Sequence, residues 1–156
     1  MTVPMKERYF EDYAVGEVHE FGDYLVTEEE IVAFAQRFDP QPFHTDPVAA
    51  ASSSFGGLIA SGWLTAAITM RLLVDHFISA VSSMGSPGID ELRWLRPVRP
   101  GDRLRVRATV LEARRSQTKP DRGAIQVLDE TVNQDGEVVM SMKGWGLYRC
   151  RSVPAA

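Results

Sequence analysis

The feature that most constrains the fold is a stretch from Trp63 to about Phe77 that is apolar on nearly every side of a helix through its first three turns. Such a helix has to be covered by protein on most of its sides. The mostly apolar run from Leu58 to Met70 stops at Arg71, well short of the ~20 residues that a membrane-spanning helix requires. We therefore predict a core helix and no membrane partner.

After this helix the hydrophobic period changes to two, which is typical of strands with one exposed face. Strands are expected at residues 89–95, 104–110, 124–132 and 137–149, the last two joined by the turn dipeptide Asp135 and Gly136. Residues 8–26 predict a turn and then an irregular strand. We expect an α+β fold of one domain, residues 1–156, with about four meander strands in a sheet that wraps the helix.

Ahead of the core helix lies a segment with two prolines, which reads Asp39, Pro40, Gln41, Pro42, Phe43, His44. Thr27 and Glu30 form a capping box, and the apolar spacing after them predicts a helix that ends near Asp39, because Pro40 disfavours helical geometry in the residue before it. Asp46 and Pro47 are typical of the start of a second, short helix. The segment is thus predicted to be a loop that holds Asp39 and His44 between two helices.

An aspartate and a histidine that flank one water molecule are able to remove its proton and orient it, an arrangement worth typically ~10²- to 10⁴-fold in rate. Ser61 and Gly62 open the core helix, so the backbone N–H of Gly62 or Trp63 is a candidate donor to a developing oxyanion. Structural roles fit the same residues: a helix-ending turn for Asp39, a solvated loop position for His44, and an N-cap with a close helix–sheet contact at Ser61 and Gly62.

Other chemistries have less support in the sequence. Asp39, His44 and Asp46 suggest a metal site, but no further His or Cys has the spacing to complete a ligand shell, so we expect no metal. His19, in a strand, and His76, near a helix C-terminus, are expected to be structural. Cys150 is expected to be a small strand hydrophobe, and a single cysteine is consistent with a reducing cytoplasm.

The formal net charge of −4 hides an asymmetry, since residues 1–90 are acidic and residues 91–156 are basic. The basic residues are spread along alternating strands without the aromatic platform that nucleic-acid binding needs, so no nucleic-acid partner is expected. The first ten residues lack the apolar stretch of a secretory signal, and a cytoplasmic location is expected.

Two segments of the chain resemble the family of MaoC-like dehydratases and (R)-specific enoyl-CoA hydratases, over nearly the full length. The family signature of Asp, one residue, Asn, Pro, one residue and His is similar to residues 39–44, and the resemblance continues through Thr45, Asp46 and Pro47 to Phe55–Gly62. The segment Leu92–Asp102 resembles the strand and turn that follow the central helix in this family.

The resemblance implies a hot-dog fold, a curved antiparallel sheet around one long central helix, assembled as a homodimer or a dimer of dimers. It implies a lyase of fatty acid metabolism that hydrates a trans-2-enoyl-CoA or dehydrates a 3-hydroxyacyl-CoA, with no cofactor beyond the coenzyme A of the substrate. Asp39 and His44 would activate water, the Gly62 N–H or its neighbour would hold the enolate oxygen, and Gln41, Pro42, Ser61 and Trp63 would contact substrate.

This chain departs from the family pattern at Gln41, which stands where the family usually has Asn, and Phe43 is bulkier than the usual aliphatic residue. Five basic residues are available for the phosphates of coenzyme A: Arg96, Arg99, Arg103, Lys119 and Arg122. Two alternatives stay open. One is a hot-dog thioesterase that directs water at the thioester carbonyl, and the other is a non-catalytic acyl-CoA-binding or assembly subunit.

Overall fold

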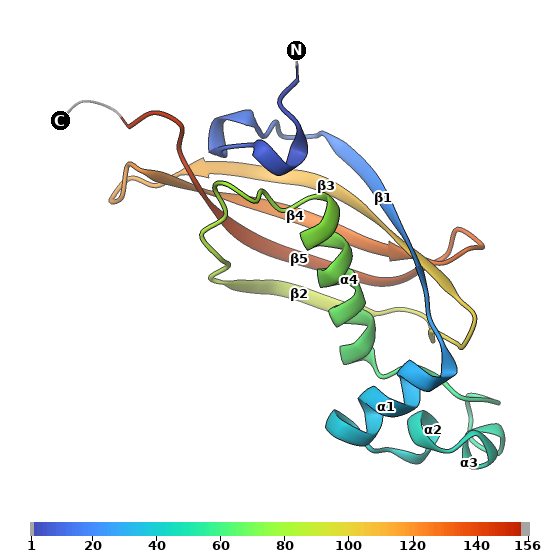
Figure 1. The fold of residues 1–156 in the computed structure, drawn as a ribbon. Coiled ribbons are helices and arrows are strands. Elements are labelled where there is room, and N and C mark those ends of the chain that lie inside the picture. The colour runs from blue at the N-terminus through green and yellow to red at the C-terminus, as the bar shows by residue number, and fades with distance from the viewer. Residues whose placement is uncertain (1, 154–156) are drawn as a thin grey trace.

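The computed structural model describes residues 2–153, which form one antiparallel sheet, four α-helices and two short 3₁₀ helices (Figure 1). The strands are β1 (Val18–Leu25), β2 (Gly88–Trp94), β3 (Arg103–Arg115), β4 (Arg122–Val132) and β5 (Val138–Arg149). The α-helices are α1 (Glu28–Phe38), α2 (Pro42–Thr45), α3 (Pro47–Ala51) and α4 (Gly62–His76), and the 3₁₀ helices are Met5–Glu7 and Phe10–Asp12. The α+β prediction is confirmed.

The strand order is β1-β3-β4-β5-β2, so the predicted four-strand meander is wrong for β2. Strands β3, β4 and β5 do form a meander, and the hairpin at Asp135 and Gly136 is confirmed, with Gly136 at φ +77°. Strand β2 pairs instead with β5, at the edge opposite β1. The connection 95–102 therefore crosses three strand spacings of about 4.8 Å each, which a segment of this length is able to span.

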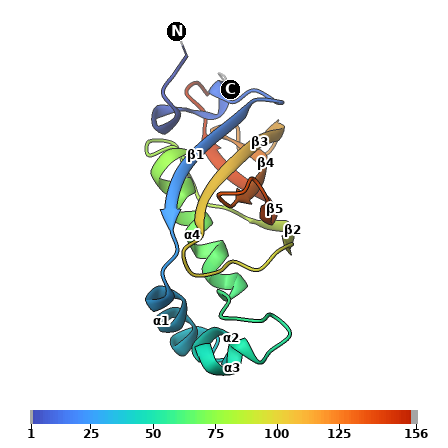
Figure 2. The ribbon, with the colours of Figure 1, turned by 90° about the vertical axis from the view of Figure 1, so that its right-hand side faces the viewer.

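Helix α4 lies against the concave face of the curved sheet, as Figure 2 shows most clearly. Its inward side chains, among them Leu64, Ile68 and Leu72, belong to one connected core that includes inward residues of the sheet. This is the hot-dog arrangement that the sequence resemblance implied.

Helix α4 is not covered on most of its sides, which corrects the expectation from its apolar sequence. Trp63, Met70 and Val74 lie on its outer side and are 61%, 46% and 45% exposed. The reason is geometric, since a single sheet covers only the side of the helix that faces it. An apolar strip of α4 therefore remains exposed on the chain taken alone.

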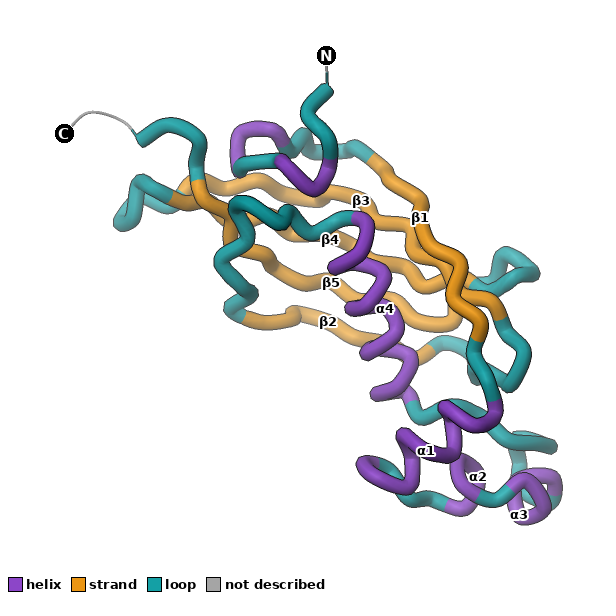
Figure 3. The backbone as a smooth tube through the Cα atoms, viewed as in Figure 1, coloured by secondary structure: helices purple, strands orange, loops and turns teal. Residues whose placement is uncertain are grey.

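Helices α1, α2 and α3 gather at one end of the sheet, beyond the N-terminus of α4 (Figure 3). Thr27 caps α1 as predicted, but the capping box is only half formed, because the Glu30 carboxylate accepts from the Tyr24 hydroxyl instead. His19 lies in β1 and His76 ends α4, as expected, and buried Cys150 directly follows β5. No helix within residues 2–153 has the length and apolar character to cross a membrane.

Candidate active site

The segment 39–44 is not the continuous loop that its prolines predicted. Asp39 is the C-cap of α1, and its non-helical backbone follows from the proline after it. Pro42 is the first residue of α2. A proline is tolerated there because the N–H at the first helical position has no partner within the helix, so its absence costs no hydrogen bond. His44 therefore stands on one short turn of helix, which fixes its direction more firmly than a loop would.

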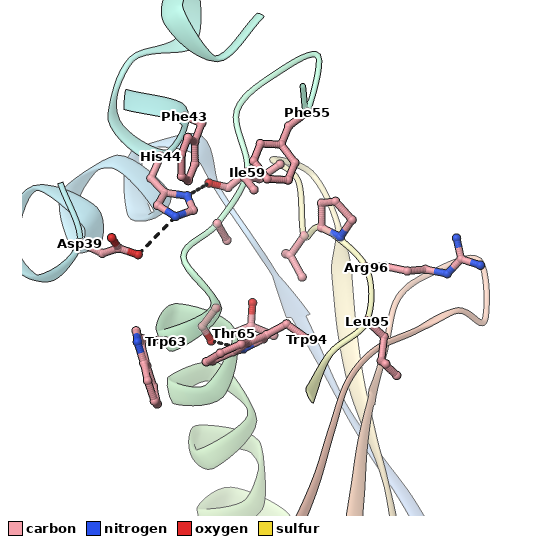
Figure 4. Close-up of a pocket in the computed structure, with 14 residues that line it drawn as sticks. Asp39, Phe43, His44, Phe55, Ile59, Trp63, Thr65, Trp94, Leu95 and Arg96 are labelled. Atoms are coloured by element: carbon pink, nitrogen blue, oxygen red, sulfur yellow. Dashed lines mark hydrogen bonds and ion pairs between the residues drawn. The ribbon is translucent and has the colours of Figure 1, made fainter. Parts of the chain in front are cut away.

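The side chains of Asp39 and His44 converge, with His44 Nε2 3.3 Å from Asp39 Oδ2 (Figure 4). Their side chains are 19% and 6% exposed, so the pair is largely withdrawn from solvent. On the other side of the ring, His44 Nδ1 lies 2.7 Å from the Ile59 carbonyl oxygen. A carbonyl oxygen only accepts, so Nδ1 carries a proton and Nε2 is the nitrogen that faces Asp39 and the pocket.

Hydrogen bonds from two other residues hold the Asp39 carboxylate in place. The Gln41 amide donates to Asp39 Oδ1 at 2.7 Å, and the Ser61 hydroxyl donates to Asp39 Oδ2 at 2.7 Å. These bonds, that of Gln41 first and that of Ser61 second, hold the pKa of Asp39 below its usual value, with a smaller contribution from His44. Asp39 is thus an oriented carboxylate that is ionised at neutral pH.

The N-terminus of α4 completes the site. Ser61 is the N-cap, and its hydroxyl oxygen accepts from the Trp63 N–H. That bond uses the Trp63 N–H, whereas the Gly62 N–H has no hydrogen-bond partner among the described residues. Glycine also fits here without a shift of its neighbour, whereas a Cβ at position 62 would lie 2.4 Å from the indole of Trp94. The geometry therefore favours Gly62 over Trp63 as a free donor.

A cavity of about 470 Å³ opens onto these groups. Of the residues predicted for the site, Asp39, His44, Gly62 and Trp63 line it. Gln41 and Pro42 do not, and neither does Ser61, which is fully buried against Asp39. Gln41 and Ser61 reach the site through Asp39 rather than by facing the cavity.

Several lining residues were not predicted from the sequence. Phe43 and Phe55 pack at a tilt in one wall, and the centroid of the Phe43 ring lies 4.5 Å from that of the His44 ring. The indole of Trp94 packs against Gly62, and its Nε1 donates a hydrogen bond to the Gly62 carbonyl oxygen. The Trp94 ring also packs edge-on against the Trp63 ring (Figure 4). Thr65 is a buried residue of α4 at the cavity wall. Phe43 lies within residues 39–44, but the other three are too distant from that segment in the sequence for a local pattern to find them.

The basic residues proposed to bind the phosphates of coenzyme A do not form one cluster in the folded chain. Arg96 lines the cavity, where its side chain extends away from His44 (Figure 4), and it pairs with Glu137. Arg99 donates to the Phe55 carbonyl oxygen. Arg103 pairs with Asp23, and Arg122 lines a different cavity.

Asp46 caps α3 through the N–H groups of Val48 and Ala49, and no three His, Cys, Asp or Glu side chains in residues 2–153 are grouped to hold a metal.

Comparisons with known proteins identify the family and the fold of this chain. The model of the MaoC like domain matches residues 12–133. The crystal structure of a MaoC-like dehydratase from Rhodospirillum rubrum superposes with a TM-score of 0.87 at 46% identity, covering 94% of this chain and 99% of that one.

Two curated relatives differ in what their names say. Uncharacterized protein YdeM of Bacillus subtilis is 30% identical over 80% of this chain and 86% of its own length. The 3-hydroxyacyl-thioester dehydratase Z of Mycobacterium tuberculosis is 33% identical over 63% of this chain and 67% of its own length.

Proposed function

The chain belongs to the MaoC-like domain family, a family of hydratases and dehydratases, and we propose that it is itself an (R)-specific hydratase of trans-2-enoyl-CoA esters, or the dehydratase of the corresponding 3-hydroxyacyl-CoA. The observation that carries the proposal is the contact between His44 Nε2 and Asp39 Oδ2 beside the free N–H of Gly62. Base and oxyanion donor thus face one cavity, which is the constellation that addition of water to a conjugated thioester requires.

In the hydration direction, one water molecule is held beside the pair, within hydrogen-bond reach of both Asp39 Oδ2 and His44 Nε2. Asp39 accepts a proton from this water as the oxygen attacks the β-carbon, and charge develops on the thioester oxygen as an enolate. The Gly62 N–H, at the positive end of the α4 dipole, stabilises that oxygen. The proton taken up by Asp39 then passes to the α-carbon, which restores the Asp39 carboxylate. Because water is added without a change of redox state, the reaction needs no cofactor besides the coenzyme A of the substrate.

The exposed strip of α4 supports the proposal that the chain works as a homodimer. Trp63 and Met70 on this helix, together with Ile89 and Trp94 on the edge strand β2, are each at least 46% exposed. Apolar side chains gathered in this way favour burial against a second copy. Trp63 and Trp94 also line the cavity, so a second copy placed here would border the substrate, and Arg96 is the basic residue best placed for a coenzyme A phosphate.

The test is the loss of the conjugated thioester absorbance when purified protein meets trans-2-enoyl-CoA esters of graded length, with chiral analysis of the 3-hydroxy product. We expect the (R) product and no free coenzyme A. Release of free coenzyme A would indicate the thioesterase instead. No turnover by the wild-type protein would favour the non-catalytic binding subunit, and unchanged turnover in both Asp39→Asn and His44→Ala would contradict the assignment of the site.

A further inference from the structure

A second cavity, of about 290 Å³, lies between the C-terminal half of α4 and the sheet. Met70 and Leu73 of α4 and its C-cap residue Phe77 form one wall, and Met142 and Tyr148 of β5 form part of another. The walls are mainly apolar, yet one carboxyl group, that of Asp129 on β4, faces into the cavity.

Asp129 is an anomaly in this environment. The alternation of β4 turns Val127, Asp129 and Thr131 to the buried side, and Asp129 is only 4% exposed. Thr131 meets a partner there, the Thr69 hydroxyl at 2.6 Å. Asp129 Oδ1 has no hydrogen-bond partner among the described residues, and burial raises the pKa of the group to about 7. An unpaired buried acceptor costs stability of roughly 1–3 kcal/mol, so its presence calls for an explanation.

The two cavities border the same side of α4. Gly62 and Thr65 line the first, and Leu73 and the C-cap residue Phe77 line the second, so the lining residues of the helix lie on neighbouring parts of its surface. From Thr65 to Met70, the first α4 residue of the second cavity, the helix rises by about 7.5 Å. Strand β2 borders both cavities as well, through Trp94 and Ile89.

We propose that the acyl chain of the substrate runs along this side of α4 into the second cavity, and that its far end carries a hydroxyl or amino group that donates a hydrogen bond to Asp129. The inference rests on the proposed hydratase function and names its substrate class, ω-hydroxy- or ω-amino-2-enoyl thioesters of medium length. The donor would satisfy the unpaired Oδ1 of Asp129, while the methylene groups would contact the apolar walls of the cavity.

The experiment compares kcat/KM of the wild-type protein for trans-2-octenoyl-CoA and for its ω-hydroxy and ω-amino forms. A site built to bond a donor discriminates against the analogue that lacks it, and we expect a preference of roughly tenfold to a hundredfold for a donor-bearing chain. Asp129→Leu should abolish or reverse this preference. Asp129→Asn keeps a carbonyl acceptor and should retain the hydroxyl preference but lose any preference for the ammonium, which separates the two donors.

The exposed Asp23→Leu, on β1, is the matched control and should leave the preference unchanged. Equal kcat/KM for the three esters in the wild-type protein, or a preference that survives in Asp129→Leu, would overturn the inference without touching the hydratase proposal. Should no ester be hydrated, the hydratase proposal fails instead. Calorimetric binding of octanoyl-CoA and ω-hydroxyoctanoyl-CoA then decides the inference, and equal affinities would overturn it.

Discussion

Asp39 and Asp129 lie towards opposite ends of α4 and face different cavities, and their surroundings act on the two carboxyl groups in opposite directions. Both oxygens of Asp39 accept hydrogen bonds, from Gln41 and Ser61, and its pKa is lowered. Asp129 accepts none within the described residues, and burial raises its pKa to about 7. An ionised carboxylate held by hydrogen bonds therefore lies near one end of α4, and a buried carboxyl group without a hydrogen-bond partner among the described residues lies near the other end.

This contrast separates two uses of a buried carboxyl group. A carboxylate that is already desolvated, oriented and charged is suited to accept a proton during a reaction, because little reorganisation remains to be done. A carboxyl group in an apolar wall without a partner lowers the stability of the free protein and gains most from a ligand that supplies the missing bond. Substitutions at each end of α4 test the two halves of this contrast separately.

The largest expected effect is on catalysis by Asp39→Asn. The amide is close in size to the carboxylate but is unable to accept a proton, so kcat for hydration should fall by roughly 10²- to 10⁴-fold. The conjugated thioester absorbance measures this directly. Asp23→Asn, an exposed residue paired with Arg103, is the matched control and should retain wild-type turnover. A loss of less than tenfold in Asp39→Asn would show that another group accepts the proton.

The second effect is on stability as a function of pH, and it should be specific to Asp129. Because its pKa is raised from 3.8 to about 7, the folded protein keeps a proton there that the unfolded chain loses. The contribution of Asp129 to the free energy of unfolding is therefore fully present below about pH 4 and is lost as the pH rises towards 7. A shift of this size corresponds to a loss of about 4 kcal/mol. Asp39 acts in the opposite sense, since its lowered pKa contributes stability that is lost as the pH falls.

Urea unfolding of wild-type protein and Asp129→Asn across this pH range isolates the contribution of Asp129, because all other groups titrate in both proteins. The free energy of unfolding of Asp129→Asn should rise relative to that of the wild type between about pH 4 and pH 7. A difference that stays constant with pH would mean that Asp129 has a partner in solution, for example across a subunit interface.

A third, smaller effect should be confined to the Asp39 end of α4. In Gly62→Ala the new Cβ would meet the Trp94 ring at 2.4 Å, so the indole has to move away from the helix. We expect a loss of about 1–3 kcal/mol in the free energy of unfolding and a change in tryptophan fluorescence. Gly57→Ala is the control, since the nearest atom to its Cβ is the end of the Arg99 side chain at 3.4 Å. The pH dependence assigned to Asp129 should persist in both variants.

The same contrast explains how much of the site could be predicted from the sequence. Asp39 and His44 are five residues apart and follow a helix with a clear stop, so local geometry was sufficient to bring them together. The bond from Ser61 to Asp39 spans 22 residues and depends on how the start of α4 docks against α1 and α2, which no local pattern encodes. Likewise, β2 pairs with β5, and residues 95–102 cross the sheet to connect β2 to β3. The order of the strands along the sequence does not reveal this pairing.

Asp129 was missed although the sequence contained a signal for it. The alternation within residues 124–132 puts Asp129 on the same face as Ile125 and Val127, which is the apolar face of that strand. A charged residue on such a face is unusual enough to mark a candidate site by its position in the strand alone. The sequence did not show that no side chain of α4 or β5 would form a hydrogen bond with Asp129 Oδ1.

The smallest effect sharpens the contrast from the side of Asp39, through Gln41→Met. Methionine has nearly the length of glutamine but no amide, so it removes the bond to Asp39 Oδ1 while the Ser61 bond remains. A hydrogen bond to a charged group contributes roughly 1.5–3 kcal/mol, and we expect kcat to fall by about tenfold. Because Gln41 is the largest cause of the lowered pKa of Asp39, the acid limb of the pH–rate profile should also move to higher pH. Gln41→Asn, which restores an amide, should recover part of both, whereas a fall in kcat with an unmoved acid limb would indicate that Gln41 shapes the turn without acting on the carboxylate.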